Sequence, residues 1–150
     1  MERKKIGTLV LVVLVIISVI FLLQWRAANV VLNLEEGNYN VGSKLSSVLT
    51  VTIEPEDSID ADTGVFLALI DSNDNVLITK TLTLREFILN SDNVIEPVLM
   101  NDKYYYETPG KYNVNAEKII DWTFSEKGDY DLFFSVFKLD LMARKKITVK

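Results

Sequence analysis

The sequence predicts an all-β fold: an antiparallel β-sandwich of about seven to nine strands, preceded by one N-terminal transmembrane α-helix. Three observations lead to this prediction. Residues 6–23, IGTLVLVVLVIISVIFLL, are eighteen uncharged residues, long enough to cross a bilayer as a helix. Short apolar segments bounded by turn residues then recur at intervals of roughly 8–15 residues. The strand–helix alternation that a parallel sheet needs is absent.

The charges around the apolar run predict its orientation. Arg3, Lys4 and Lys5 precede it, whereas Trp25 and Arg26 follow it. Since the more basic flank of a membrane helix stays in the cytoplasm, residues 1–26 are expected to form a cytoplasmic tip and a transmembrane anchor. Residues 27–150 then form one extracytoplasmic domain, so we expect a single-pass protein of the cell membrane.

Two alternatives for the N-terminus stay open. A cleaved signal peptide has a similar charged start and apolar core, but Arg26 stands where the Arg26-Ala27-Ala28 segment would need a small residue for cleavage. The Lys4-Lys5-Ile6-Gly7 segment resembles an archaeal class III prepilin leader, which implies cleavage after Gly7 and assembly into a filament. Bacterial pilins have a Glu five residues after the cut, where this chain has Val12.

Composition excludes several functions. The segment from residue 27 onward has 12 Lys and Arg against 20 Asp and Glu, a net charge of −8, which disfavours a nucleic-acid partner. The chain contains no Cys and no His. Disulfide scaffolds, most zinc sites and Ser-His-Asp triads are therefore excluded, and no catalytic residue, cofactor or metal site is expected.

Apolar alternation places the strands. We expect them at residues 30–34, 45–54, 65–70, 76–79, 103–106, 112–114, 120–124, 130–138 and 144–150. The continuous apolar run of residues 65–70 indicates a central strand covered on both sides. In residues 130–138, Tyr130, Leu132, Phe134 and Val136 lie on one face.

Polar residues between the strands predict a turn and one helix. The segment Asp71–Asn75 resembles the start of an EF-hand loop, but Val76 and Leu82 occupy the positions of the required Gly and Glu, so we expect a hairpin turn. Thr83 and Glu86 form a capping box, in which the side chain of each residue accepts a hydrogen bond from the backbone N–H of the other. A short helix is therefore predicted to run through Leu89.

Five carboxylates lie within residues 54–62. They belong to Glu54, Glu56, Asp57, Asp60 and Asp62. Such oxygens are the ligands that calcium prefers, but no calcium-loop motif accompanies them. A solvated acidic turn is the favoured interpretation, and calcium binding by this loop is left open.

Two motifs carry a resemblance. Gly128-Asp129-Tyr130 precedes an apolar strand and looks like the tyrosine corner of immunoglobulin-like (Ig-like) domains. The segment from Tyr39 through Gly42 to Leu45 is similar to the Tyr-x-x-Gly-x-x-Leu pattern of arrestin-like and archaeal surface β-sandwiches. With the apolar run, the chain resembles archaellum stator subunits and archaeal pilins, which implies an Ig-like domain that binds an envelope protein or packs into a filament.

The expected function is a membrane-anchored, extracytoplasmic β-sandwich that binds protein or builds the cell envelope. A pilin-like filament subunit and an enzyme using only carboxylates are the alternatives. Partners are the membrane, through residues 6–23, a protein of the envelope and a second copy of the chain. Tyr104, Tyr105 and Tyr106 are the candidate contact residues, because tyrosine is enriched at interfaces. Neighbours in a strand face opposite sides, so at least one ring should face solvent unless the rings only close the core.

Overall fold

Strands dominate the computed structural model, which describes residues 29–33, 39–137, 139 and 141–150. All pairs between the named strands are antiparallel. The prediction of an all-β, antiparallel sandwich is confirmed for this part of the chain. The predicted anchor at residues 6–23 lies outside the described residues.

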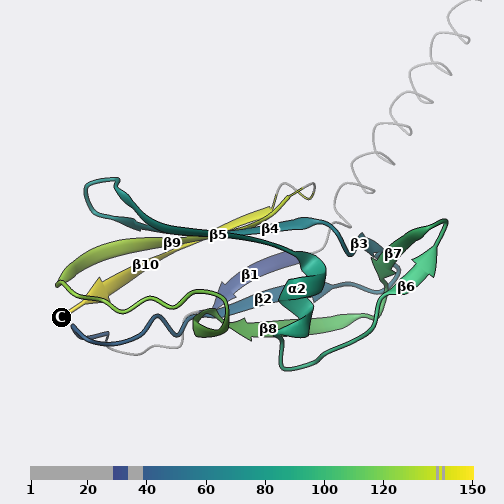
Figure 1. Cartoon of the computed structure of the whole chain (residues 1–150), viewed down its shortest axis with the longest axis horizontal. Helices are drawn as coiled ribbons and strands as arrows, with labels where there is room; N and C mark the ends of the chain where they lie inside the picture. Colours follow the sequence, from purple (N-terminus) through teal and green to yellow (C-terminus); the bar gives the residue numbers. More distant parts are fainter. Residues whose placement is uncertain (1–28, 34–38, 138, 140) are drawn as a thin grey trace, which may run out of the picture.

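Two sheets form the sandwich (Figure 1). The first has the order β1-β2-β8, and its strands are β1 (Asn29–Asn33), β2 (Val48–Ile53) and β8 (Gly110–Asn115). The second has the order β10-β9-β4-β5, and its strands are β4 (Gly64–Asp71), β5 (Val76–Thr83), β9 (Gly128–Val136) and β10 (Leu141–Val149). With the third sheet, the described residues form ten strands, one more than the upper limit of the predicted range of seven to nine.

A third, smaller sheet was only partly predicted. It has the order β3-β7-β6 and contains β3 (Ile59–Asp60), β6 (Val98–Met100) and β7 (Lys103–Tyr106). Only β7 was expected from the sequence. The other two strands are too short for a period-two pattern to emerge, since alternation needs about four residues or more to be recognised.

The core fills the space between the two large sheets. The apolar residues that alternate along β2, namely Leu49, Val51 and Ile53, are buried, as are Leu132, Phe134 and Val136 of β9. On β4, Val65, Leu67 and Leu69 lie beside these β9 residues in the same sheet and are also buried. Because β4 lies between β5 and β9, its predicted central position is confirmed. The predicted cover on both sides is not: Phe66 and Ile70, which alternate with the core residues, are only partly buried.

Helix α2 (Leu84–Leu89) closes one open side of the sandwich, between β5 and β8. Its N-terminus has the predicted capping box: Glu86 N donates to Thr83 Oγ1 over 3.2 Å, and Thr83 N donates to Glu86 Oε2 over 2.7 Å. Phe87 enters the core and stacks on Phe134, with 5.5 Å between the ring centres. The helix therefore supplies core side chains where no strand bridges the two sheets.

The turn between β4 and β5 has the expected hairpin form. Asp71 Oδ1 accepts hydrogen bonds of 2.9 Å from the backbone N–H groups of both Asn73 and Asn75. Asp74 has a φ of +63°, which Asp adopts more readily than most residues. The carboxylate is thus used to hold the turn.

The prediction of a strand at residues 120–124 is wrong. After β8, the chain forms a short 3₁₀ helix, η1 (Ala116–Lys118), and then a loop with a single isolated bridge between Thr123 and Lys44. Ile120 and Phe124 are nevertheless buried. The alternation arose because alternate side chains reach the core. Three backbone hydrogen bonds join residues 122–124 to residues 42–45, but they amount to one bridge and not to a continuous ladder.

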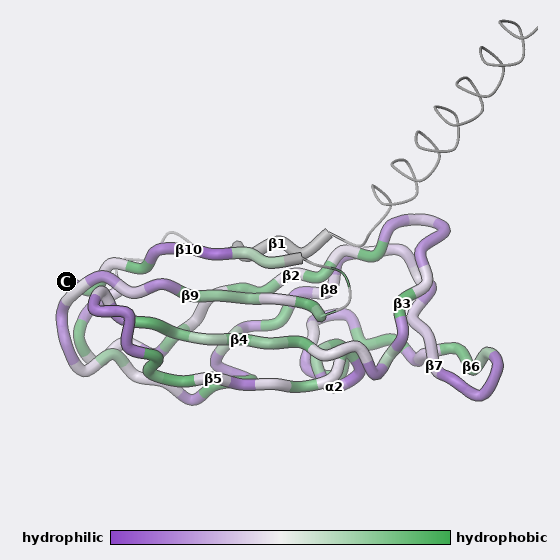
Figure 2. Tube along the Cα trace, turned by 90° about the horizontal axis from the view of Figure 1, so that it is seen from above, coloured by the Kyte–Doolittle hydropathy of each residue, from purple (hydrophilic) through white to green (hydrophobic). Residues whose placement is uncertain are grey.

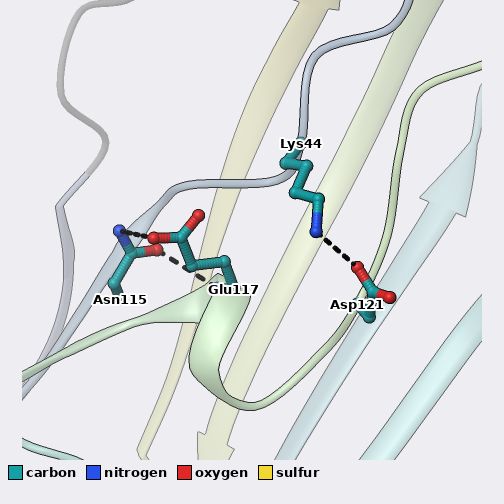
Figure 3. A network of polar contacts seen from close by, with 4 residues as sticks. All are labelled: Lys44, Asn115, Glu117 and Asp121. Carbon is teal, nitrogen blue, oxygen red and sulfur yellow. Dashed lines mark hydrogen bonds and ion pairs between the residues drawn. The ribbon is translucent and has the colours of Figure 1, made fainter.

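Polar contacts fasten this loop to its surroundings (Figure 3). Asn115 caps η1, since its Oδ1 accepts from Glu117 N over 3.1 Å. Lys44 Nζ lies 3.1 Å from Asp121 Oδ1, and both side chains are largely exposed. An exposed ion pair of this kind contributes about 0–1 kcal/mol, so the buried side chains, more than this pair, hold the loop in place.

Candidate partner-binding surface

Strands β6 and β7 form a hairpin that extends beyond the end of the sandwich (Figure 1). Its register pairs Val98 with Tyr105 and Leu99 with Tyr104. Asn101 and Asp102 connect the strands, with φ values of +48° and +63°. Positive φ at both central residues is what a type I′ hairpin turn requires. The turn therefore holds the two strands in a defined register outside the main core.

Leu99 and Tyr104 form an exposed pair on one face of the hairpin. Since they lie directly opposite one another, their side chains share a face. Leu99 is 58% exposed and Tyr104 43% exposed. Val98 is also exposed and lies beside the half-buried Tyr105 on the other face. The hairpin thus presents large apolar side chains to solvent.

Tyr106 is buried although it shares a face with Tyr104. It pairs with Ile59 of β3, and both side chains are buried in the core. Tyr104 lies two residues closer to the hairpin tip, beyond the edge of the sandwich. The expectation that at least one ring faces solvent is met by Tyr104, and burial leaves Tyr104 and Tyr105 as the members of the trio that can touch a partner.

The hydroxyl of Tyr106 is buried and forms no hydrogen bond with any described residue. Burial raises the pKa of this phenol above its ordinary value, since its effect exceeds that of the nearby Arg85, which lowers the pKa; Glu96 acts in the same direction as burial. An unpaired buried hydroxyl costs stability. The residue therefore serves the core through its ring.

Arg85 holds the ring of Tyr104 against the domain. Its guanidinium carbon lies 5.2 Å from the ring centre, within the range of a cation–π contact. Backbone hydrogen bonds also connect β7 to the start of α2. Ala61 N donates to Tyr104 O over 2.8 Å, and Arg85 N donates to Ala61 O over 3.0 Å. The start of α2 and the base of the hairpin are therefore linked through residue 61.

Carboxylates surround the apolar side chains of the hairpin. Glu96, Asp102 and Glu107 are exposed residues in or next to β6 and β7. The hairpin itself contributes one cation, Lys103, at the end of the β6–β7 turn. With Arg85 over Tyr104, three carboxylates and two cations surround the apolar side chains, an excess of one negative charge that sequence analysis of the three tyrosines alone did not predict.

The acidic loop of residues 54–62 uses two of its carboxylates to fix backbone turns. Asp57 Oδ2 accepts from Glu54 N over 3.3 Å, and Asp60 Oδ1 accepts from Asp62 N over 2.9 Å. Within the described residues, no three Asp, Glu, His or Cys side chains come together as a metal site would require. The calcium interpretation of this loop gains no support from its geometry.

Among the described residues, no helix is both long and apolar enough to span a membrane. The predicted anchor at residues 6–23 and the predicted domain boundary after residue 26 fall in the part of the chain that is not described.

No known protein family matches the chain, and neither does any curated protein. Among solved structures, the chain is similar to the CooA pilin subunit from enterotoxigenic Escherichia coli, with 11% sequence identity and a TM-score of 0.27. The similarity covers 82% of this chain and 95% of the pilin chain. At this identity and TM-score the similarity supports no statement about this chain, so the function must be argued from this protein's own residues.

Proposed function

We propose that the protein is a single-pass, membrane-anchored Ig-like domain outside the cytoplasm that binds protein or serves as a structural part of the cell envelope. The anchor is proposed from residues 6–23, which are uncharged, with Arg3, Lys4 and Lys5 on the side expected to remain in the cytoplasm. The domain is proposed to begin near Ala27.

The strand order supports the Ig-like assignment. Ig-like domains pack strands A, B and E against strands G, F and C, and some add a further strand beside C. Here β1-β2-β8 corresponds to A-B-E, and β10-β9-β4-β5 corresponds to the second sheet with its additional strand. Among the described residues, strand D has no counterpart; α2 and the small sheet lie in the corresponding part of the chain.

Tyr130 supports the same assignment. It lies near the start of β9, the counterpart of strand F, and its Oη donates a hydrogen bond of 2.9 Å to the backbone oxygen of Glu126. This is the arrangement of a tyrosine corner. The chain departs from antibody domains in having Leu132 where their second Cys would stand and no Trp in β4.

The observation that carries the binding function is the projecting hairpin with Leu99 and Tyr104 exposed side by side. Large apolar side chains gathered on a rigid projection mark interaction sites more often than isolated exposed ones do. Tyrosine is well suited to such a site because it offers a large area at a low entropic cost. We therefore propose Tyr104 and Tyr105 as contact residues for a partner protein.

The first test concerns the anchor. After extraction of membranes with alkaline carbonate, the full-length protein should remain in the pellet, and protease added outside the cell should reach the domain. Recovery of the intact protein in the carbonate supernatant would reject the anchor. A measured mass lacking Met1–Gly7 would instead favour the pilin-like alternative, in which the leader is removed.

The second test concerns the contact residues. Tyr104→Ser loses the Arg85 contact and Tyr105→Ser loses a half-buried ring, so each should lower the thermal midpoint slightly, and at least one should abolish copurification of the partner. Tyr106→Ser is the matched control: it should lower the midpoint strongly, because it removes a buried ring. Unchanged copurification with both Tyr104→Ser and Tyr105→Ser would place the interface elsewhere.

A further inference from the structure

The outer face of the β10-β9-β4-β5 sheet is a second exposed surface with apolar character. In Figure 2 these four strands run side by side, and no described helix or strand covers the outer face. Side chains that alternate with the core residues lie on it. Phe66 and Ser135 are paired across β4 and β9, and Ser135 is paired with Met142 of β10.

Large apolar side chains gather at one end of this face. Met142 is 70% exposed and Phe137 is 47% exposed. The Phe137 ring lies 6.1 Å from that of Phe66, measured between ring centres, and over Gly64, where a Cβ atom would lie 2.5 Å from Phe137 Cδ2. We call Phe66, Phe133, Phe137 and Met142 the outer-face patch.

Basic side chains border the outer-face patch. The guanidinium carbon of Arg144 lies 5.1 Å from the ring centre of Phe133, and its Nη2 lies 2.6 Å from Asp131 Oδ2. Lys146 is the next residue along the same face of β10 and is exposed. Beside the outer-face patch, Arg144 and Lys146 thus outnumber the one carboxylate of Asp131, whereas at the hairpin the three carboxylates outnumber the cations Lys103 and Arg85.

The hairpin and the outer-face patch lie at the same end of the sandwich. Gly64 begins β4, Val136 ends β9 and Leu141 begins β10, and the register places all three at one end. The short strand β3, which holds the hairpin, directly precedes β4. Asn29, the start of β1, pairs with Thr52 near the end of β2 that leads to β3, so β1 begins at this end too (Figure 1).

From this placement we propose that the protein's partner is a second copy of the same chain, with the hairpin of one copy docked on the outer-face patch of the next. The inference rests on the proposed membrane anchor. Residues 24–28 separate the predicted anchor from Asn29, and five extended residues reach at most about 18 Å. In neighbouring anchored copies, both surfaces are thus held at a similar height above the membrane.

Charge complementarity selects this occupant. Glu96, Asp102 and Glu107 of one copy would face Arg144 and Lys146 of the next, around a contact of Leu99 and Tyr104 with Phe137 and Met142. Opposite potentials at the rim of an apolar contact steer association and suppress wrong partners. Since the two surfaces differ, the contact is head-to-tail: repeated by rotation about the membrane normal it forms rings, and otherwise it forms open chains.

Cysteine cross-linking tests the contact, because the chain has no Cys of its own. Full-length Leu99→Cys and Met142→Cys proteins with different tags are produced together in one membrane and oxidised. Copies in the proposed contact should form a disulfide between the two tags, since the Cα atoms must approach to about 4.4–6.8 Å. The matched control pairs Leu99→Cys with Asp74→Cys in the β4–β5 turn, at the opposite end of the sandwich, and should give little product.

Charge reversal separates recognition from random collision. Asp102→Lys or Lys146→Glu alone should reduce the yield of the cross-link about threefold, the size expected for a rim ion pair. Combining Asp102→Lys in one copy with Lys146→Glu in the other should restore it. A merely structural effect would not be rescued in this way.

Several results would overturn the proposal. They are equal yields with the Asp74→Cys control, preferential joining of two hairpins through Leu99→Cys, cross-linking of the hairpin to a different polypeptide, or quenching of a fluorophore at position 99 by brominated lipid. Each of these can occur while the protein remains in the carbonate-resistant membrane fraction. Failure of the copy-to-copy contact is therefore distinguishable from failure of the membrane anchor.

Discussion

The hydroxyl of Tyr130 donates a 2.9 Å hydrogen bond to the backbone oxygen of Glu126, four residues earlier in the chain. Tyr112 makes the same kind of bond to the oxygen of Thr108, over 2.7 Å and the same separation of four residues. In both cases a tyrosine near the start of a strand ties the preceding loop to the sandwich while its ring stays in the core.

Loss of the Tyr130 bond should destabilise the protein. Tyr130→Phe keeps the ring but leaves the Glu126 oxygen without its partner, at a cost of about 0.5–1.5 kcal/mol, or up to about 3 kcal/mol if that oxygen stays buried and unpaired. The measurement is the urea midpoint of residues 27–150.

Tyr106→Phe is the matched control. The Tyr106 hydroxyl is buried and has no hydrogen-bond partner among the described residues, so its removal should leave the midpoint unchanged or raise it slightly. Equal losses at Tyr130 and Tyr106 would contradict the role assigned to the Tyr130 bond.

The capping box predicts a measurable loss at the start of α2. Thr83→Ala removes the oxygen that accepts from Glu86 N and should lower the free energy of unfolding by about 1 kcal/mol. Glu86→Gln keeps an acceptor for Thr83 N and should cost less. If Thr83→Ala had no effect, packing of Leu84, Phe87 and Ile88 alone would hold the helix.

Gly64 leaves room for the ring of Phe137. Gly64→Ala places a Cβ about 2.5 Å from Phe137 Cδ2, so the ring must move, at a cost of about 1 kcal/mol, the low end for overpacking because the ring is partly exposed. In a Phe137→Ala background the same substitution should be nearly neutral. Equal costs in both backgrounds would show that the strain lies in the backbone.

Alkaline pH should destabilise the fold through its buried tyrosines. Burial raises the pKa of Tyr106, Tyr112 and Tyr130 above the ordinary 10.0. The unfolded chain therefore loses these phenolic protons first, and the free energy of unfolding falls as the pH rises above about 10. Urea midpoints at about pH 9 and about pH 11 should show this loss, and Tyr106→Phe should reduce it. A constant midpoint would contradict the prediction.

Local chemistry made much of the fold predictable. The period-two pattern of β9 defined its buried face because that strand has one side toward the core. Thr83 and Glu86 defined the start of α2, and Asp71 the turn after β4, because in each case the hydrogen-bond partners lie within four residues of one another. Contacts that short need no knowledge of the rest of the chain.

Tertiary structure decided the candidate site. Tyr104 and Tyr106 are both tyrosines on the same face of β7. Only Tyr106, which pairs with Ile59, is buried in the core. Arg85 lies over Tyr104 through contacts made at Ala61, and the pairing with Leu99 depends on a turn the sequence did not reveal.

The sequence by itself determined the strand-rich class, the apolar run at residues 6–23 and the acidic character of the remainder, because these follow from residue type and spacing along the chain. Only the tertiary structure decided the strand order, the failure of residues 120–124 to form a strand, and the grouping of Phe66, Phe137 and Met142 on one face. The physical reason is that burial and pairing depend on residues distant in sequence, and no periodic pattern encodes which of them meet.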